Sequence, residues 1–157
     1  MSAEKKETAG VIAPPPLVYA AGLVPGWLLE RRWPSPYGLI EPLAQWIGWS
    51  LIAVGVVVLV WALIALRRVR TSVNPYTPST AIATTGPYRW SRNPIYVADL
   101  VIYLGVCALL NSLWPLLFLP AVIWIVNKGV IEREERYLEN RFGNLYTVYK
   151  SRVRRWL

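Results

Sequence analysis

A run without a single charged side chain, from Leu43 to Leu66, constrains this chain more than any other feature. At about 1.5 Å of rise per residue, a helix of this length crosses the roughly 30 Å hydrocarbon core of a bilayer. Arg67, Arg68 and Arg70 end the run abruptly, as the cytoplasmic flank of a membrane helix does. The sequence therefore predicts a transmembrane helix at this position.

Three further apolar segments predict additional spans. Residues 11–29 form an irregular first segment, and residues 97–110 and 113–126 form a pair split by Asn111 and Ser112. Both members of the pair are short, so we expect a tight helical hairpin that tilts or stops short of the far surface. Beyond residue 126 the chain turns polar and helical. The predicted fold is an all-α integral membrane protein with about four transmembrane helices and C-terminal cytoplasmic amphipathic helices.

The formal charge of +8 raises the possibility of nucleic-acid binding, but the distribution of charge argues against it. Apolar runs interrupt any continuous basic face. With four spans, only Arg31 and Arg32 of the 17 Lys and Arg residues lie on the side opposite the 67–96 loop. The positive-inside rule then makes the loop side cytoplasmic. We expect membrane lipids and no nucleic acid as partners, and localisation in the inner (cytoplasmic) membrane.

Residue usage also limits the chemistry. The chain contains no histidine, which removes the usual general base and the usual zinc ligand. Its one cysteine, Cys107, lies in an apolar run and is interpreted as a small buried hydrophobe. We therefore expect no metal site.

Three polar clusters are expected to meet at the cytoplasmic surface of the membrane. They are Tyr88, Arg92, Asn93 and Tyr96 in a proline-rich loop; Glu134 and Glu135 after the fourth span; and Tyr146 and Tyr149, with Arg152 nearby, in the last helix. Glutamates and tyrosine faces suit a sulfonium or ammonium centre, and an arginine suits a carboxylate. S-adenosylmethionine carries a sulfonium, an ammonium and a carboxylate group. Methyl transfer depends on alignment and charge complementarity, so a site without histidine is compatible with it.

Each member of these clusters also has an ordinary interpretation. Arg89 and Arg92 fit anchors for lipid phosphates, the glutamates fit a solvated helix face, and the tyrosines fit interfacial packing. Asn93 and Pro94 fit a simple turn into a helix. Asp99, just inside the third span, is either a functional group or a residue that snorkels to the interface. The order and spacing of the whole set favour function.

The same residues resemble a known family. Gly86-Pro87-Tyr88-Arg89 followed by Arg92-Asn93-Pro94-Ile95-Tyr96 is similar to the signature of the membrane-embedded isoprenylcysteine carboxyl methyltransferases, their bacterial relatives and the phospholipid methyltransferases. Glu134-Glu135, Phe142-Gly143, Tyr146, Tyr149 and Val153 resemble the family's C-terminal pattern. The resemblance covers residues 71–157.

The resemblance implies a cytoplasm-facing S-adenosylmethionine pocket and a lipophilic or lipid-anchored acceptor entering from the bilayer. Carried over by position, the donor site comprises Tyr88, Asn93, Pro94, Tyr96 and Glu134, while Arg92 and Glu135 are closest to catalysis. One domain, 1–157, then comprises a flexible tail (1–10), two N-terminal spans (11–66) and a cofactor-binding and catalytic part (71–157).

Two departures from the family pattern bear on the substrate. Asn93 replaces the histidine of the eukaryotic enzymes and cannot titrate. Asp99 replaces a residue that is usually small, so a prenylated protein need not be the acceptor; a prenylcysteine-like carboxylate, a lipid amine and a small thiol remain open. The alternatives are a related lipid-binding reductase and a non-enzymatic scaffold that binds phospholipid head groups. The oligomeric state is not predicted.

Overall fold

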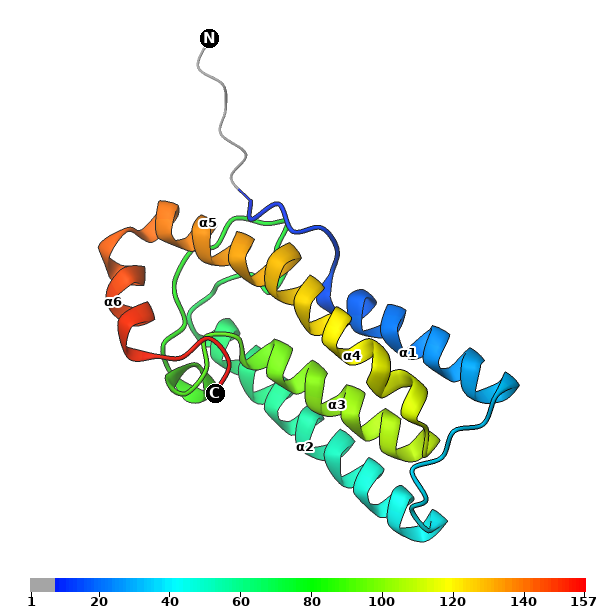
Figure 1. Cartoon of the computed structure of the whole chain (residues 1–157). Coiled ribbons are helices and arrows are strands. Elements are labelled where there is room, and N and C mark those ends of the chain that lie inside the picture. The colour runs from blue at the N-terminus through cyan, green and yellow to red at the C-terminus, as the bar shows by residue number, and fades with distance from the viewer. Residues whose placement is uncertain (1–7) are drawn as a thin grey trace.

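The computed structural model describes residues 8–157, so most of the predicted tail, 1–10, lies outside it. Within the described range the chain is helical and forms no extended strand. Figure 1 shows long helices lying roughly side by side, with the C-terminal helices at one end of the group. The elements are α1 (Pro15–Arg32), α2 (Glu41–Arg68), the 3-10 helix η1 (Gly86–Arg89), α3 (Pro94–Leu110), α4 (Leu113–Val126), the π-helical η2 (Asn127–Ile131), α5 (Glu132–Phe142) and α6 (Asn144–Arg152).

Helices α2 and α3 pack closely because glycines face each other across their interface. A side chain at Gly48 would meet Leu109 and the carbonyl oxygen of Gly105, and one at Gly55 would meet Ile102. Small residues at such contacts allow two backbones to approach, which is how helices associate in membranes. This pairing fixes the start of α3, and the loop before it, against the end of α2.

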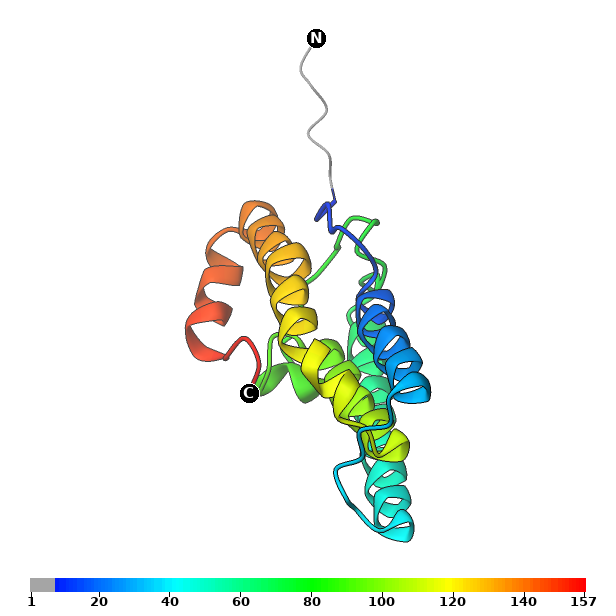
Figure 2. The same ribbon diagram turned by 45° about the vertical axis from the view of Figure 1, so that its right-hand side comes forward.

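Helix α4 packs mainly against α1 and less extensively against α3. The turn between α3 and α4 is tight, as predicted, with Asn111 in the left-handed region (φ 45°) and the Ser112 hydroxyl capping α4. The two helices are therefore joined by the predicted tight turn, and each arm has a different main packing partner, α2 for α3 and α1 for α4. Figures 1 and 2 show α2 beside α3 and α1 beside α4.

Helices α4, η2 and α5 form one continuous helix in two chemical halves. Its apolar half ends with η2, and from Glu132 onward most residues are charged. We place this charged half, α5, outside the hydrocarbon core. Within residues 8–157, two helices are long and apolar enough to cross a membrane, Glu41–Arg68 and Leu113–Phe142, and α3 is a shorter apolar helix.

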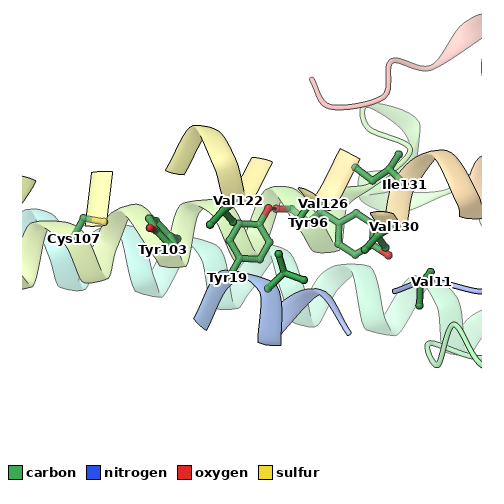
Figure 3. Close-up of a cluster of buried hydrophobic side chains, with 10 residues drawn as sticks. Val11, Tyr19, Tyr96, Tyr103, Cys107, Val122, Val126, Val130 and Ile131 are labelled. Atoms are coloured by element: carbon green, nitrogen blue, oxygen red, sulfur yellow. Dashed lines mark hydrogen bonds between the residues drawn. The ribbon is translucent and has the colours of Figure 1, made fainter. Parts of the chain in front are cut away.

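A cluster of buried side chains runs between α1, α3 and the continuous helix (Figure 3). Tyr19 of α1 donates a hydrogen bond of 3.1 Å to the carbonyl oxygen of Tyr96. Tyr103 donates to the carbonyl oxygen of Pro115 at 2.5 Å. Since a buried hydroxyl needs a partner, these bonds fix how α1 and α4 sit on α3.

Candidate functional site

The site begins with the loop that leads into α3. Gly86 has a φ of +61° and lies against Trp61 and Ala65 of α2, where a side chain would be both strained and crowded. Pro94 occupies the first turn of α3, a position at which the missing N–H costs nothing. The helix thus starts three residues earlier than predicted, at the Asn93–Pro94 turn.

The end of the chain is bound to this loop. The backbone N–H of Arg92 donates to the carbonyl oxygen of Arg154 at 2.9 Å, and the side-chain amide of Asn93 donates to the carbonyl oxygen of Arg155 at 2.9 Å. The Ser91 hydroxyl donates to that same carbonyl oxygen at 3.3 Å. Segments about sixty residues apart in sequence therefore meet at the first predicted cluster.

Arg92 and Glu135 form a buried ion pair. Nη2 of Arg92 lies 2.9 Å from Oε1 of Glu135, and both side chains are almost fully buried, at 8% and 6% exposed. Nη1 of Arg92 donates to the carbonyl oxygen of Lys150 at 3.2 Å. Nε of Arg92 is buried and has no hydrogen-bond partner among residues 8–157.

Arg155 holds the same carboxylate from the other side. Its Nε and Nη2 donate to Oε1 and Oε2 of Glu135 at 3.1 and 2.8 Å. This hydrogen bonding to Glu135 raises the pKa of the Arg155 guanidinium, which stays charged. Nothing in the sequence pattern separates Arg155 from the other arginines at the chain end, and the sequence analysis did not select it.

Glu134 has a different environment from its neighbour. Both of its carboxylate oxygens accept a hydrogen bond from the hydroxyl of Tyr96, at 2.8 and 2.7 Å. It forms none of the ion pairs found among residues 8–157. Burial raises the pKa of the Glu134 carboxyl to about 7, and the hydrogen bond from Tyr96 opposes that shift. A partly buried carboxylate without a cationic partner among residues 8–157 is an arrangement that a nearby cation would stabilise.

Three buried tyrosines complete the site. The rings of Tyr146 and Tyr149 are tilted, with centroids 6.0 Å apart, and the hydroxyl of Tyr149 donates to the carbonyl oxygen of Tyr88 at 2.8 Å. Burial raises the pKa of the Tyr88, Tyr146 and Tyr149 hydroxyls. These phenols therefore stay neutral at physiological pH and offer aromatic surface and hydrogen bonds without negative charge.

A cavity lies among these groups and brings together nine of the eleven predicted site residues. They are Tyr88, Arg92, Asn93, Pro94, Tyr96, Glu134, Glu135, Tyr146 and Tyr149. The two remaining residues are not part of its lining: Arg152 is exposed on α6, and Asp99 lies further along α3, with Oδ2 buried and unpartnered within the described chain.

Other parts of the chain also line the cavity, and the sequence analysis did not select them. Ala9, before α1, and Leu66, at the end of α2, both contribute to its wall. Tyr137 of α5 accepts a hydrogen bond from the backbone N–H of Ser79 at 2.9 Å and so fixes the long loop. Among residues 8–157 there is no group of His, Cys, Asp and Glu side chains able to hold a metal ion.

Comparison with known proteins identifies the family. A region of the Protein-S-isoprenylcysteine O-methyltransferase of Schizosaccharomyces pombe is 33% identical to this chain over 72 residues, which is 46% of this chain and 30% of the yeast protein. An uncharacterized protein of Haemophilus influenzae is 40% identical over 63 residues, which is 40% of this chain and all of that protein. Residues 43–145 match the model of the phospholipid methyltransferase family. That match includes nearly all of α2, the whole of α3 and most of the cavity lining, and the chain belongs to this family.

Proposed function

We propose that the chain is an S-adenosylmethionine-dependent methyltransferase that acts on a lipophilic acceptor at the cytoplasmic face of the membrane. The observation that carries this proposal is the cavity. The loop before α3, α5 and α6 all contribute side chains to its lining, and the ion pair of Arg92 and Glu135 is among them. Membership of the phospholipid methyltransferase family agrees with this activity.

The charges around the cavity fit the methyl donor. Glu134 offers a partly buried carboxylate without a cationic partner in the described chain, which complements a sulfonium or ammonium group. Arg92 retains an N–H donor on Nε without an acceptor among residues 8–157, and a ligand carboxylate would supply one. The rings of Tyr146 and Tyr149 offer aromatic faces to a cation.

When bound, S-adenosylmethionine supplies a methyl group whose carbon–sulfur bond breaks as the acceptor's nucleophile attacks, leaving a neutral thioether. The protein's part is to orient the donor, exclude water and match its charge. Glu135 is held by two arginines, and its proposed role is to orient Arg92.

The membrane setting has its own support. Only 17% of the most apolar 18-residue stretch of α2 is buried within the protein. The core helix of a soluble protein would be mostly buried. We propose four spans, α1 to α4, with the cavity and α5–α6 on the cytoplasmic side of the inner membrane. Asp99 lies one helical turn beyond Ile95, which lines the cavity, so it is placed to contact an acceptor that enters from the bilayer. Arg152 remains a second candidate for acceptor contact.

Calorimetric titration of the purified protein in detergent with S-adenosylhomocysteine tests the proposal. We expect micromolar binding that is lost in Arg92→Ala and in Glu135→Ala. Arg89→Ala is the matched control, because Arg89 lies in the same loop with an exposed side chain, and it should bind like the wild type.

The same titration separates the alternatives. A well-folded protein that does not bind S-adenosylhomocysteine would exclude the methyltransferase and favour a scaffold for phospholipid head groups. Binding of a nicotinamide cofactor in its place would favour a lipid-binding reductase. A screen of lipophilic acids, amines and thiols with labelled methyl donor would then identify the acceptor.

A further inference from the structure

The last residues of the chain make a dense set of contacts with the candidate site. The carbonyl oxygens of Arg154 and Arg155 accept hydrogen bonds from the loop before α3, and Nε1 of Trp156 donates to Oδ1 of Asn127 at 3.2 Å. We call residues 154–156 the C-terminal clasp. It joins the loop on one side to η2 and α5 on the other.

We propose that Arg155 is a positioning residue of the methyl-donor site, acting through Glu135 on Arg92; this inference rests on the proposed function. Arg155 does not line the cavity, whereas Arg92 and Glu135 do. Its effect on a ligand therefore passes through the carboxylate that it holds.

The geometry of Glu135 supports this role. Arg92 contacts a single oxygen, Oε1, at 2.9 Å, whereas Arg155 contacts both Oε1 and Oε2. Two parallel hydrogen bonds fix the plane of a carboxylate in a way that a single contact does not. Arg155 thus sets the orientation of Glu135, and Glu135 in turn holds the end of the Arg92 guanidinium.

Burial makes this arrangement sensitive to loss of Arg155. Glu135 is 5% exposed, so removing one of its two cations leaves a buried carboxylate with one contact to a single arginine. Removing one partner of a buried charge pair is strongly unfavourable because the other charge stays buried. The expected response is a shift of Glu135 toward solvent, which would draw Arg92 out of position.

The backbone of Arg155 adds a second link. Its carbonyl oxygen accepts from both Asn93 and Ser91, so one residue orients both the amide of Asn93 and the ion pair beside it. A lysine at position 155 would keep this carbonyl and the charge but not the two-pronged contact. Comparison of Arg155→Lys with the wild type therefore isolates the contribution of the guanidinium from those of the charge and the backbone carbonyl.

Arg155 is accessible from outside the cavity. Its side chain is 34% exposed and lies in a second depression, which is lined by Glu132, Glu139 and Lys150 among others and shares Glu135 with the cavity. A small guanidinium compound in solution can therefore reach the space left by truncation without passing through the donor cavity. Rescue by such a compound would not be expected if Arg155 only stabilised the fold.

The test uses full-length protein in detergent and S-adenosylhomocysteine as the probe. We expect Arg155→Ala to weaken binding by about tenfold or more, equivalent to about 1.4 kcal/mol, and Arg155→Lys to recover only part of that loss. Ethylguanidinium should restore binding to Arg155→Ala and not to Arg155→Lys. Arg154→Ala removes the same charge from the adjacent, exposed side chain and should bind within about twofold of the wild type.

A double-mutant cycle with Glu135→Gln shows whether Arg155 acts through Glu135. If it does, adding Arg155→Ala to Glu135→Gln should weaken binding no further. Thermal unfolding of the ligand-free variants measures the coupling between Arg155 and Glu135 in folding stability, without any methyl donor. The same experiment reports whether each variant folds. If Arg155→Ala does not fold, Arg155→Lys and Arg155→Gln take its place.

Each outcome has a distinct meaning. Wild-type protein that does not bind the probe refutes the proposed function, while the ligand-free cycle still measures the Arg155–Glu135 coupling. If the wild type binds the probe and the Arg155 variants bind it as tightly as Arg154→Ala does, the positioning role is overturned and the proposed function stands. The same conclusion follows if the effects of Arg155→Ala and Glu135→Gln on binding are fully additive.

Discussion

Replacing Glu134 with glutamine tests the electrostatic argument for the donor site. The change keeps the size of the side chain and an acceptor for the Tyr96 hydroxyl, but removes the charge. Burial raises the pKa of the Glu134 carboxyl from 4.5 to about 7. A sulfonium beside it favours the ionised form, so binding of S-adenosylmethionine should strengthen as the pH rises through this value.

The expected size of the effect follows from the fraction of Glu134 that is ionised. A carboxyl with a pKa of about 7 is about 10% ionised at pH 6 and about 90% ionised at pH 8. The affinity of the wild type for S-adenosylmethionine should therefore rise about tenfold over this range, equivalent to about 1.4 kcal/mol. Glu134→Gln should lose this dependence and bind more weakly at pH 8.

The ligand-free protein should respond in the opposite sense. Since the folded state holds the Glu134 proton more tightly than the unfolded chain, the free energy of unfolding should fall as the pH rises from 4.5 to about 7. The cost at pH 8 is on the order of 3 kcal/mol. Glu134→Gln should therefore raise the Tm of the ligand-free protein at pH 8 and change that Tm little at pH 5.

Calorimetry at pH 6, 7 and 8, with S-adenosylmethionine and S-adenosylhomocysteine in parallel, provides the assay. The two ligands share an amino-acid end whose amine also titrates, so the ratio of their affinities isolates the sulfonium. The reasoning is refuted if this ratio is flat in the wild type, or if its rise with pH survives in Glu134→Gln.

Three further predictions concern other parts of the chain. Asn93→Ala should weaken binding of S-adenosylhomocysteine by about tenfold with an unchanged circular dichroism spectrum, since the lost hydrogen bond is worth about 1 kcal/mol or more; unchanged affinity would remove Asn93 from the site. Asp99→Gly should alter preference among acids, amines and thiols more than it alters donor affinity, and equal activity across such a panel in both proteins would contradict this. Gly48→Ala should lower stability by about 1–3 kcal/mol, because its Cβ would lie 2.9 Å from the Gly105 carbonyl oxygen. Val57→Ala, on the exposed face of the same helix, should change the Tm much less, and equal shifts would show that the α2–α3 contact is not close.

The helices could be predicted because the sequence marks their ends with strong local signals. The charge-free run of α2 stops at arginines, the left-handed Asn111 separates α3 from α4, and Gly143 (φ 54°) ends α5. Pairing between helices is not local. Small residues such as Gly48, Gly55 and Gly105 allow close helix contacts, but the sequence does not say which helix each of them faces.

Convergence of the loop, α5 and α6 could be predicted because each contributes a cluster of unusual polar residues at the end of an apolar segment. Arg155 could not be selected in this way. It is one of several arginines at the chain end, and it is distinguished only by the position of its guanidinium against Glu135. Ala9 and Leu66 have no polar chemistry, and only the packing of the helices places them at the cavity.

Glu134 and Glu135 show why adjacent carboxylates need separate arguments. Consecutive residues of a helix point about 100° apart, so these two side chains leave α5 in different directions. Glu135 meets Arg92 and Arg155 and is neutralised within the protein, whereas Glu134 meets only the hydroxyl of Tyr96. Under the proposed function, the sulfonium would lie beside Glu134, the carboxylate without a cationic partner among residues 8–157. The sequence gives both residues the same charge, and their difference arises only from which groups α5 faces.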